Sequence, residues 1–362
     1  MVDRKTVSVG RRAIIKGTAA GAAAIAFPTV LAPRKTRAAQ RLVARNPGGP
    51  FEKAFGEAYD KPFQAATGIE IVNVTGQHEP IAMIKGMVDT KTYTWDVTIL
   101  SNYTHNVLAE AGYLEPLNLD SDPIIQEIPK QFRSPYIIGN YVWSTVLAYR
   151  TDVYPAKGKA PTGGWKDLWD VKGIPGRRGM RKYPVDTIEP ALLADGVTPD
   201  KLYPLDMDRA FKSLDKIKKD VTVWWSGGAQ SSQLLKSGEL DICVAWNGRA
   251  QTVMDEGAPV NISWNQALWS YDGWAIPKGS PTADLARKFI RFVSEAKNQV
   301  AFTPYVAYGP TNQNATKMID PKRLRELPTN PDYFKTMVPN DAVQWSKVQE
   351  KALERFNTWL IS

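Results

Sequence analysis

Cysteine and histidine are scarce in this chain of 362 residues. Cys243 is the only cysteine, and His78 and His105 are the only histidines. An intrachain disulfide is therefore impossible, and so is a zinc or iron–sulfur site built on clustered cysteines. A polyhistidine metal site is disfavoured for the same reason, so the sequence predicts neither a metal nor a cofactor.

Long apolar runs are also missing, and the first 38 residues hold only a weakly apolar stretch. Arg11-Arg12 is followed by Ala-Ile-Ile-Lys, then by an Ala/Gly-rich segment with small residues at Thr36 and Ala38. This order is typical of a secretory signal, and the adjacent arginines resemble the twin-arginine export signal of bacteria. We expect cleavage after Ala38, export by the twin-arginine translocase and a periplasmic mature protein. A retained anchor is the weaker alternative, because a membrane span needs about 20 apolar residues.

A strong net charge is absent once this leader is set aside. The whole chain has 46 Lys and Arg against 37 Asp and Glu, a formal charge of +9. Residues 1–38 hold eight basic residues and one acid, so the remainder has 38 basic and 36 acidic residues and a charge of +2. A nucleic-acid partner, which suits a basic protein, is therefore not expected. The content of 43% hydrophobic and 23% charged residues also excludes intrinsic disorder and a polytopic membrane protein.

Motifs of common hydrolases and nucleotide-binding enzymes are missing too. The sequence contains no G-x-S-x-G, no H-E-x-x-H and no phosphate-binding loop. Asp186 and Glu189 are paired acids, as glycosidases require, but acids three residues apart rarely flank one bond from opposite faces. We therefore expect no enzyme, with a secreted hydrolase as the weaker alternative.

Strand and helix patterns alternate after residue 40. Strands are predicted over residues 69–74, 95–100, 141–149, 221–225 and 240–246. Helices are predicted over residues 51–66, 79–89, 104–111, 208–219, 229–237, 284–296 and 341–360. This alternation is typical of an α/β fold with parallel strands, in which ligands bind beyond the carboxyl ends of strands. Ser101–Tyr103 lies at such an end.

Several segments in a fixed order resemble one protein family. They are Trp95–Tyr103, Trp165–Trp169, Trp246–Gly248, Asp272–Pro277 and Tyr308–Asn312. Together they resemble the spermidine/putrescine-binding group among the substrate-binding proteins of bacterial ABC importers. The resemblance implies a two-lobed periplasmic-binding-protein fold of type II with a hinge of crossing strands. It places residues 41–143 and 274–310 in lobe 1, and residues 144–273 and 311–362 in lobe 2.

Carboxylates and aromatic walls are what a polyamine site needs, for the ammonium groups and the methylenes respectively. Asp186 and Glu189 share one face if a helix begins near Asp186. The resemblance assigns both to one ligand ammonium, and the alternative is a pair of acids stabilised by the helix dipole. Asp272 precedes an apolar strand in the predicted hinge, where its partner is either a ligand ammonium or a structural cation.

The resemblance implies further ligand contacts. It makes Trp246 an aromatic wall, Ser101 and Tyr103 contacts from the first lobe, and Tyr308 a cleft tyrosine, with core packing as the alternative for Trp246 and Tyr308. One departure stands out: the aromatic residues expected after the first strand are replaced by residues 45–50, Arg-Asn-Pro-Gly-Gly-Pro. The glycine N–H groups there suit an anionic or hydroxylated part of a ligand, and one aromatic wall is expected to be missing or replaced.

These observations predict a monomeric periplasmic receptor for a small organic amine such as putrescine or spermidine. It would capture the amine between two lobes and deliver it to an ABC permease in the inner membrane. The departure leaves open the same type of receptor for γ-aminobutyrate or another amino acid, or for a ferric complex. Tyr103 and His105 are the only local hint of iron, and we interpret His105 as a solvated helix residue.

Overall fold

The computed structural model describes residues 40–76 and 79–362. The predicted signal peptide and its cleavage site lie outside the described residues and stay predictions. Among the helices that are described, none has both the length and the apolar character that a membrane span requires.

The strands of the described residues form one mixed sheet. They are β1 (Arg41–Asn46), β2 (Glu70–Thr75), β3 (Val97–Ser101), β4 (Arg133–Ser134), β5 (Ile137–Arg150), β6 (Arg178–Arg181), β7 (Val221–Trp225), β8 (Ile242–Trp246), β9 (Val260–Ala275), β10 (Gly309–Pro310) and β11 (Val338–Pro339). Their order is β2-β1-β3-β9-β5-β8-β6-β7, with β4 and β10 on β5 and β11 on β9. The pairs β1·β2, β1·β3, β6·β7 and β6·β8 are parallel, which confirms the α/β fold class.

Helices connect these strands, as the alternating pattern predicts. They are α1 (Pro50–Phe55), α2 (Lys61–Thr67), α3 (Ile81–Thr90), α4 (Asn102–Glu110), α5 (Pro123–Gln126), α6 (Lys166–Trp169), α7 (Ile188–Ala194), α8 (Met207–Ile217), α9 (Gly228–Ser237), α10 (Asn247–Asp255), α11 (Ala283–Val293), α12 (Ala296–Phe302), α13 (Gln313–Thr316), α14 (Pro321–Leu324), α15 (Pro331–Phe334) and α16 (Ala342–Ile361). A π-helical turn over Gly56–Asp60 joins α1 to α2. Gly68 ends α2 in the left-handed region, with φ at 70°.

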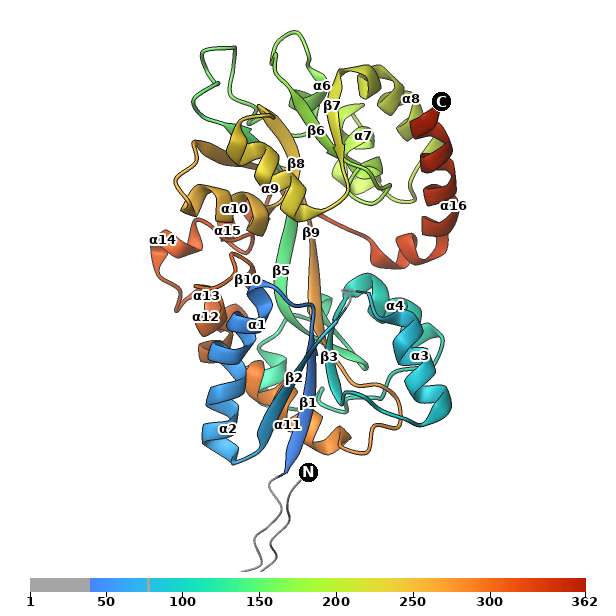
Figure 1. Ribbon diagram of the computed structural model, residues 1–362, viewed down its shortest axis with the longest axis vertical. Coiled ribbons are helices and arrows are strands. Elements are labelled where there is room, and N and C mark those ends of the chain that lie inside the picture. The colour runs from blue at the N-terminus through green and yellow to red at the C-terminus, as the bar shows by residue number, and fades with distance from the viewer. Residues whose placement is uncertain (1–39, 77–78) are drawn as a thin grey trace, which may run out of the picture. The chain divides into compact units, whose positions relative to one another are not determined.

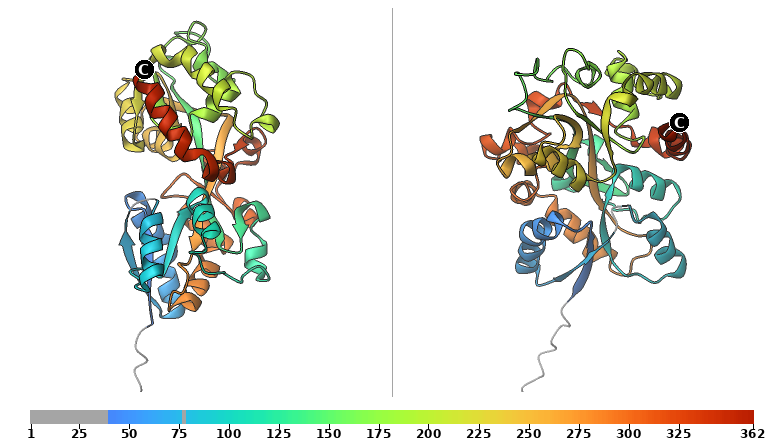
Figure 2. Two further views of the ribbon diagram at one scale, coloured as in Figure 1. Left: turned by 90° about the vertical axis from the view of Figure 1, so that its right-hand side faces the viewer. Right: turned by 45° about the horizontal axis from the view of Figure 1, so that its top comes forward.

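Apolar side chains gather around the two sets of parallel strands separately. One core includes Leu42 of β1, Val97 of β3 and Phe289 of α11. The other set of cores combines β6, β7 and β8 with α7 to α10 and the C-terminal α16. We call these the β1–β3 half and the β6–β8 half. Figures 1 and 2 show α16, in red, lying on the β6–β8 half.

Two long antiparallel strands connect the halves. Strands β5 and β9 have 14 and 16 residues, and they pair from Ile138↔Trp274 at one end to Arg150↔Val260 at the other. Figure 1 shows them passing side by side from one half to the other. Position 273 in this strand pair requires glycine, because a Cβ there would lie 2.5 Å from the carbonyl oxygen of Ile138. This strand pair is the hinge of crossing strands expected from the sequence.

The predicted lobe boundaries are not fixed by this topology and stay a prediction. Residues 311–326, assigned to lobe 2, form hydrogen bonds with the β1–β3 half: Thr311 donates to Gly139, and Arg323 donates to Thr303.

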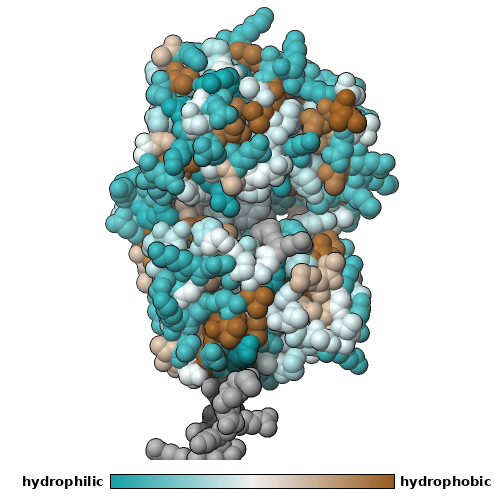
Figure 3. Space-filling model, viewed as in Figure 1, coloured by the Kyte–Doolittle hydropathy of each residue, from teal (hydrophilic) through white to brown (hydrophobic). Residues whose placement is uncertain are grey.

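The surface in Figure 3 shows apolar side chains as separate patches among polar ones, and it is hollowed at mid-height.

Candidate ligand-binding site

A cavity of about 510 Å³ is lined by residues of both halves and of the crossing strands. Five of the seven predicted ligand residues line it: Ser101, Tyr103, Trp246, Asp272 and Tyr308. Its charged lining residues are of both signs: Glu79, Asp272, Arg181 and Arg249. Asp186 and Glu189 are not among the lining residues, so the predicted pair of carboxylates does not face this cavity.

Asp272 presents a carboxylate at the hinge. Its strand, β9, runs antiparallel to β5, which places Asp272 opposite Tyr141. The hydroxyl of Tyr141 donates to Oδ2 at 2.9 Å, and the indole N–H of Trp143 donates to Oδ1 at 2.8 Å. The side chain is 2% exposed. These two neutral donors stabilise the carboxylate and orient it.

Aromatic rings surround this carboxylate. The ring of Tyr141 lies 5.6 Å from that of Phe51 and 5.2 Å from that of Tyr308. Phe51, Trp143 and Tyr308 all line the cavity. Rings placed around an anionic site also attract a cation through their faces. Of the two alternatives for the aromatic wall after the first strand, missing or replaced, the structure favours replacement, because Phe51, a few residues further on, supplies a ring.

The glycine segment between β1 and α1 differs from its predicted role in one detail. Pro47 to Phe51 line the cavity, as expected for a loop at the carboxyl end of β1. However, the N–H of Gly48 donates to Oδ1 of Asn46 at 2.8 Å. That N–H stabilises the turn, in which Gly48 has a φ of 79°, and is not presented to a ligand.

Arg249 places a positive charge in the same cavity. It follows Asn247-Gly248 in the first turn of α10, directly after β8. Within the described residues its guanidinium has no hydrogen bond and no ion pair. Burial and the Asp272 carboxylate raise the pKa of the Tyr308 hydroxyl, and the Arg249 guanidinium lowers it. Both charges therefore act on one hydroxyl.

Gly248 allows the Tyr308 ring to pack closely against the first turn of α10. A Cβ on Gly248 would lie 2.7 Å from Cε1 of the Tyr308 ring. The preceding Asn247 is fully buried, accepts from the N–H of Ser144 at 2.9 Å and donates to the carbonyl of Ala307 at 2.6 Å. The Trp-Asn-Gly segment thus ties α10 to β5 and to the segment that carries Tyr308.

Arg181 is the second cation, and it is held in place. It is the last residue of β6, and its Nη1 donates to Oδ2 of Asp186 at 2.6 Å. The guanidinium carbon lies 4.7 Å from the ring centre of Tyr183 and 5.0 Å from that of Trp246. The indole N–H of Trp246 also donates to Asp186, at 3.2 Å. Trp246 thus forms a wall of the cavity, whereas Asp186 lies behind that wall and pairs with arginine.

Glu189 lies inside the β6–β8 half. Helix α7 begins at Ile188, after Asp186, so the two acids do not share the helical face assumed from their spacing. Three groups donate to Oε1 of Glu189: the indole N–H of Trp345, the amide of Asn340 at 2.9 Å and the hydroxyl of Tyr203 at 3.3 Å. Burial, and then the charge of Asp186, raise the pKa of Glu189 to about 8.

This pKa predicts how stability depends on pH. Unfolded Glu189 releases its proton near pH 4.5, whereas the folded carboxyl keeps it to about pH 8. The folded state therefore binds more protons between these values, and stability falls as pH rises through the window, by up to about 1.4 kcal/mol per pH unit. Calorimetric melting of the protein and of Glu189→Gln at pH 5, 6.5 and 8 measures this. The variant is expected to lose less stability toward pH 8, and parallel curves would contradict the assignment.

Ser101 and Tyr103 stand where β3 passes into α4. The Ser101 hydroxyl accepts from the N–H of Thr104 at 3.1 Å and so caps α4. It also donates to Glu79 at 2.9 Å. Burial and nearby negative charges, including that of Glu79, raise the pKa of Tyr103. The carboxyl-end position predicted for these residues therefore places them at the cavity.

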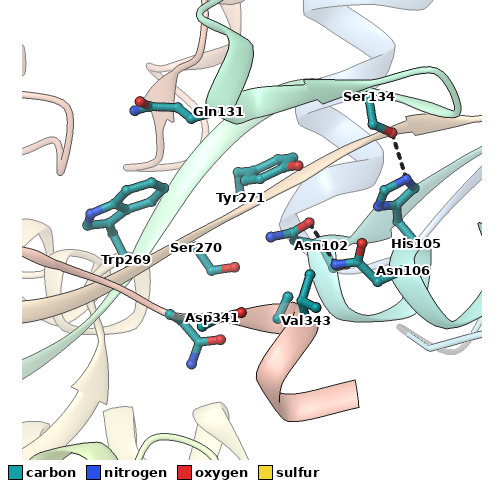
Figure 4. A pocket seen from close by; sticks show the side chains of 12 residues that line it. Asn102, His105, Asn106, Gln131, Ser134, Trp269, Ser270, Tyr271, Asp341 and Val343 are labelled. Carbon is teal, nitrogen blue, oxygen red and sulfur yellow. Dashed lines mark hydrogen bonds between the residues drawn. The ribbon is translucent and has the colours of Figure 1, made fainter. Parts of the chain in front are cut away.

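A smaller cavity of about 290 Å³ lies beside α4 and the start of α16, and shares Ser270 and Asn340 with the larger one. Figure 4 shows the hydrogen bond between Ser134 and His105 at its edge, at 2.9 Å. His105 is 4% exposed and burial lowers its pKa to about 4, so its interpretation as a solvated residue is wrong. Asp341, the only charged residue of this lining, caps α16. The larger cavity, with charges of both signs, is therefore the candidate ligand site.

The lining residues that were not predicted from the sequence include Phe51, Glu79, Trp143, Arg181 and Arg249. Arg181 ends β6, and Arg249 follows the end of β8, so the rule that ligands bind beyond strand ends could have found both. In the part of the chain that is described, no three His, Cys, Asp or Glu residues are grouped as metal ligands would be.

The fold and this cavity together define a two-lobed solute-binding protein: two parallel-strand halves, a pair of crossing strands and a charged cavity lined by both halves. Residues 58–329 match the family model described as bacterial extracellular solute-binding protein. The chain belongs to this family.

Individual relatives differ in what they bind. The γ-aminobutyric acid-binding protein of Pseudomonas aeruginosa is 35% identical over 329 residues, 88% of this chain and 91% of that protein. A solved structure of the GABA receptor Atu4243 is 34% identical, with a TM-score of 0.80, and covers 89% of this chain and 98% of its own. The spermidine/putrescine-binding periplasmic protein 1 of Haemophilus influenzae is 26% identical over 276 residues, 74% of each chain. The predicted family is thus confirmed at the level of extracellular solute-binding proteins.

Proposed function

We propose that this protein is the solute receptor of an ABC importer and that its ligand is a short zwitterion of the γ-aminobutyrate type. The ammonium end lies at Asp272 among the rings of Phe51, Trp143 and Tyr308. The carboxylate end lies at Arg249. This replaces putrescine or spermidine, the main prediction from the sequence, by the alternative considered there.

The observation that carries the proposal is that the Asp272 carboxylate and the Arg249 guanidinium line the same cavity. Tyr308 lies within the electrostatic range of both groups. A ligand with one positive and one negative end is complementary in charge to both groups, and charge-assisted hydrogen bonds are the stronger kind. Between them, the aromatic rings cover a short methylene chain. The two relatives that are named for γ-aminobutyrate support the same reading.

A diamine fits this cavity less well than a zwitterion does. Its second ammonium would approach either Arg249 or Arg181, and like charges in a partly buried site repel. The carboxylates predicted to hold that ammonium, Asp186 and Glu189, lie outside the cavity lining. The more distant relationship to the polyamine-binding protein agrees with this argument.

The proposal includes the transport cycle implied by the resemblance. Ligand binding draws the two halves together about β5 and β9, and the closed receptor docks on a membrane permease. The leader, residues 1–38, directs export of the folded chain to the periplasm. No reaction is assigned to the cavity, so the ligand is released unchanged.

A thermal-shift panel tests the proposal on the purified protein. Ligands that bind only the folded state stabilise it by RT ln(1+[L]/Kd), so a micromolar ligand at millimolar concentration raises Tm measurably. The panel contains γ-aminobutyrate, putrescine, spermidine, several α-amino acids and ferric citrate. We expect γ-aminobutyrate to give the largest shift. A larger shift with putrescine or spermidine would restore the polyamine assignment, and one with ferric citrate would replace both.

A further inference from the structure

The wall formed by Arg181, Tyr183 and Trp246 has a buried carboxylate behind it. Asp186 is 1% exposed and does not line the cavity. Its Oδ2 accepts from Nη1 of Arg181 at 2.6 Å and from the indole of Trp246 at 3.2 Å. The Arg181 guanidinium also lies over the rings of Tyr183 and Trp246. Asp186 thus fixes both an arginine and a tryptophan that face the ligand.

This arrangement makes the two arginines of the cavity unequal. Arg249 has no ion pair within the described residues, so its charge is available to a ligand. The charge of Arg181 is largely cancelled by a carboxylate that is itself buried and therefore little screened by water. Two uncompensated guanidinium groups would suit a ligand with two carboxylates. One compensated and one free guanidinium suit a ligand with one.

We propose that Asp186 is a specificity-determining residue, which neutralises Arg181 and so restricts the cavity to amines that carry a single carboxylate. It acts through Arg181 and touches no ligand atom, so it is a positioning residue. The inference rests on the proposed function and adds to it the class of ligand that is rejected: amino dicarboxylates such as glutamate, which is γ-aminobutyrate with one more carboxylate. The resemblance assigned Asp186 to a ligand ammonium, whereas its cationic partner here is Arg181 of the protein itself.

The variant Asp186→Asn tests this with little disturbance of the backbone. Asp186 has a φ of 68°, in the left-handed region, which asparagine accepts more readily than most residues. The asparagine oxygen still accepts from Trp246 and Arg181, while the negative charge is gone. Asp186→Gly, which suits the same φ, carries the test if the first variant does not fold. Asp195→Asn removes an equal charge from the pairs that Asp195 makes with Arg209 and Lys216, and serves as the matched control.

Calorimetric titration of each protein with γ-aminobutyrate and with L-glutamate gives the ratio of the two Kd values. The Asp186 variants are expected to favour glutamate at least tenfold more than the unmodified protein does, and Asp195→Asn to leave the ratio unchanged. Adding Arg181→Gln to Asp186→Asn should remove the gain. If the role of Asp186 is purely structural, its variants bind both ligands more weakly and the ratio of the Kd values stays unchanged. That result would overturn this inference and leave the proposed function standing. Failure of the unmodified protein to bind γ-aminobutyrate would overturn the proposed function and the inference with it.

Discussion

Replacing Asp272 with asparagine is expected to weaken the binding of γ-aminobutyrate at least a hundredfold, about 2.7 kcal/mol. The carboxylate is 2% exposed, and it is oriented toward the cavity by the donors Tyr141 and Trp143. Without its charge, the ligand ammonium is desolvated against a neutral amide, and removing one partner of a buried charge pair costs about 2–5 kcal/mol. Calorimetric titration measures the loss.

The fold of this variant is expected to survive. The asparagine oxygen accepts from Trp143, and its amide donates to the Tyr141 hydroxyl, so both neighbours keep a hydrogen bond. Asp284→Asn is the control, because Asp284 has a side chain that is 94% exposed on α11. Near-normal affinity in Asp272→Asn, with Tm unchanged in both variants, would take the ammonium role from Asp272.

Replacing Arg249 with methionine is expected to have the second large effect. Methionine retains much of the aliphatic stem but removes the charge, so γ-aminobutyrate should again bind at least a hundredfold more weakly. Putrescine should bind to the variant at least as tightly as to the unmodified protein, because the variant lacks the positive charge that repels its second ammonium group. This difference in direction separates loss of a carboxylate partner from general damage to the cavity.

The control for this variant is Arg355→Met, on the exposed side of α16, where Arg355 pairs with Asp208 at 2.7 Å. Titration of both variants with γ-aminobutyrate and putrescine completes the comparison. Equal losses for the two ligands in Arg249→Met would contradict the assignment of the carboxylate end to Arg249.

The secondary structure could be predicted where local signals coincide. Thr67-Gly68 marks the end of α2, because Gly68 adopts the left-handed φ that closes a helix. Ser101 marks the start of α4, where its hydroxyl caps the helix. Only the end of the crossing strand β9, after Asp272, was predicted, whereas the strand begins at Val260. Its first part pairs with β5, far away in sequence, and no local pattern reveals that partner.

The site could be predicted only in part, because charge pairing is a long-range property. The spacing of Asp186 and Glu189 indicates a shared face, but the partners that decide their roles come from elsewhere: Trp345 lies 156 residues from Glu189, and Trp246 lies 60 residues from Asp186. The structure places Asp272 in the cavity lining, and its position before an apolar run was a local feature of the sequence; its ligand role stays a prediction.

Phe51 and Arg249 line the cavity, although they were not predicted as ligand residues from the sequence. Phe51 fits the apolar pattern of a helix, so it reads as a core residue, although the start of α1 brings its ring to the cavity. Arg249 reads as one charged residue among many until the topology places β8 beside β5 and its carboxyl end at the crossing strands. Its presence there reverses the expected preference from a diamine to a zwitterion.

The central claim, recognition of both ends of a short zwitterion, is tested most directly by titrating the unmodified protein with four compounds of similar length. γ-Aminobutyrate carries both charges, n-butylamine only the ammonium, n-butyrate only the carboxylate, and putrescine two ammonium groups. The account predicts that γ-aminobutyrate binds at least a hundredfold more tightly than each of the other three. Binding of putrescine or n-butylamine as tight as that of γ-aminobutyrate would contradict it.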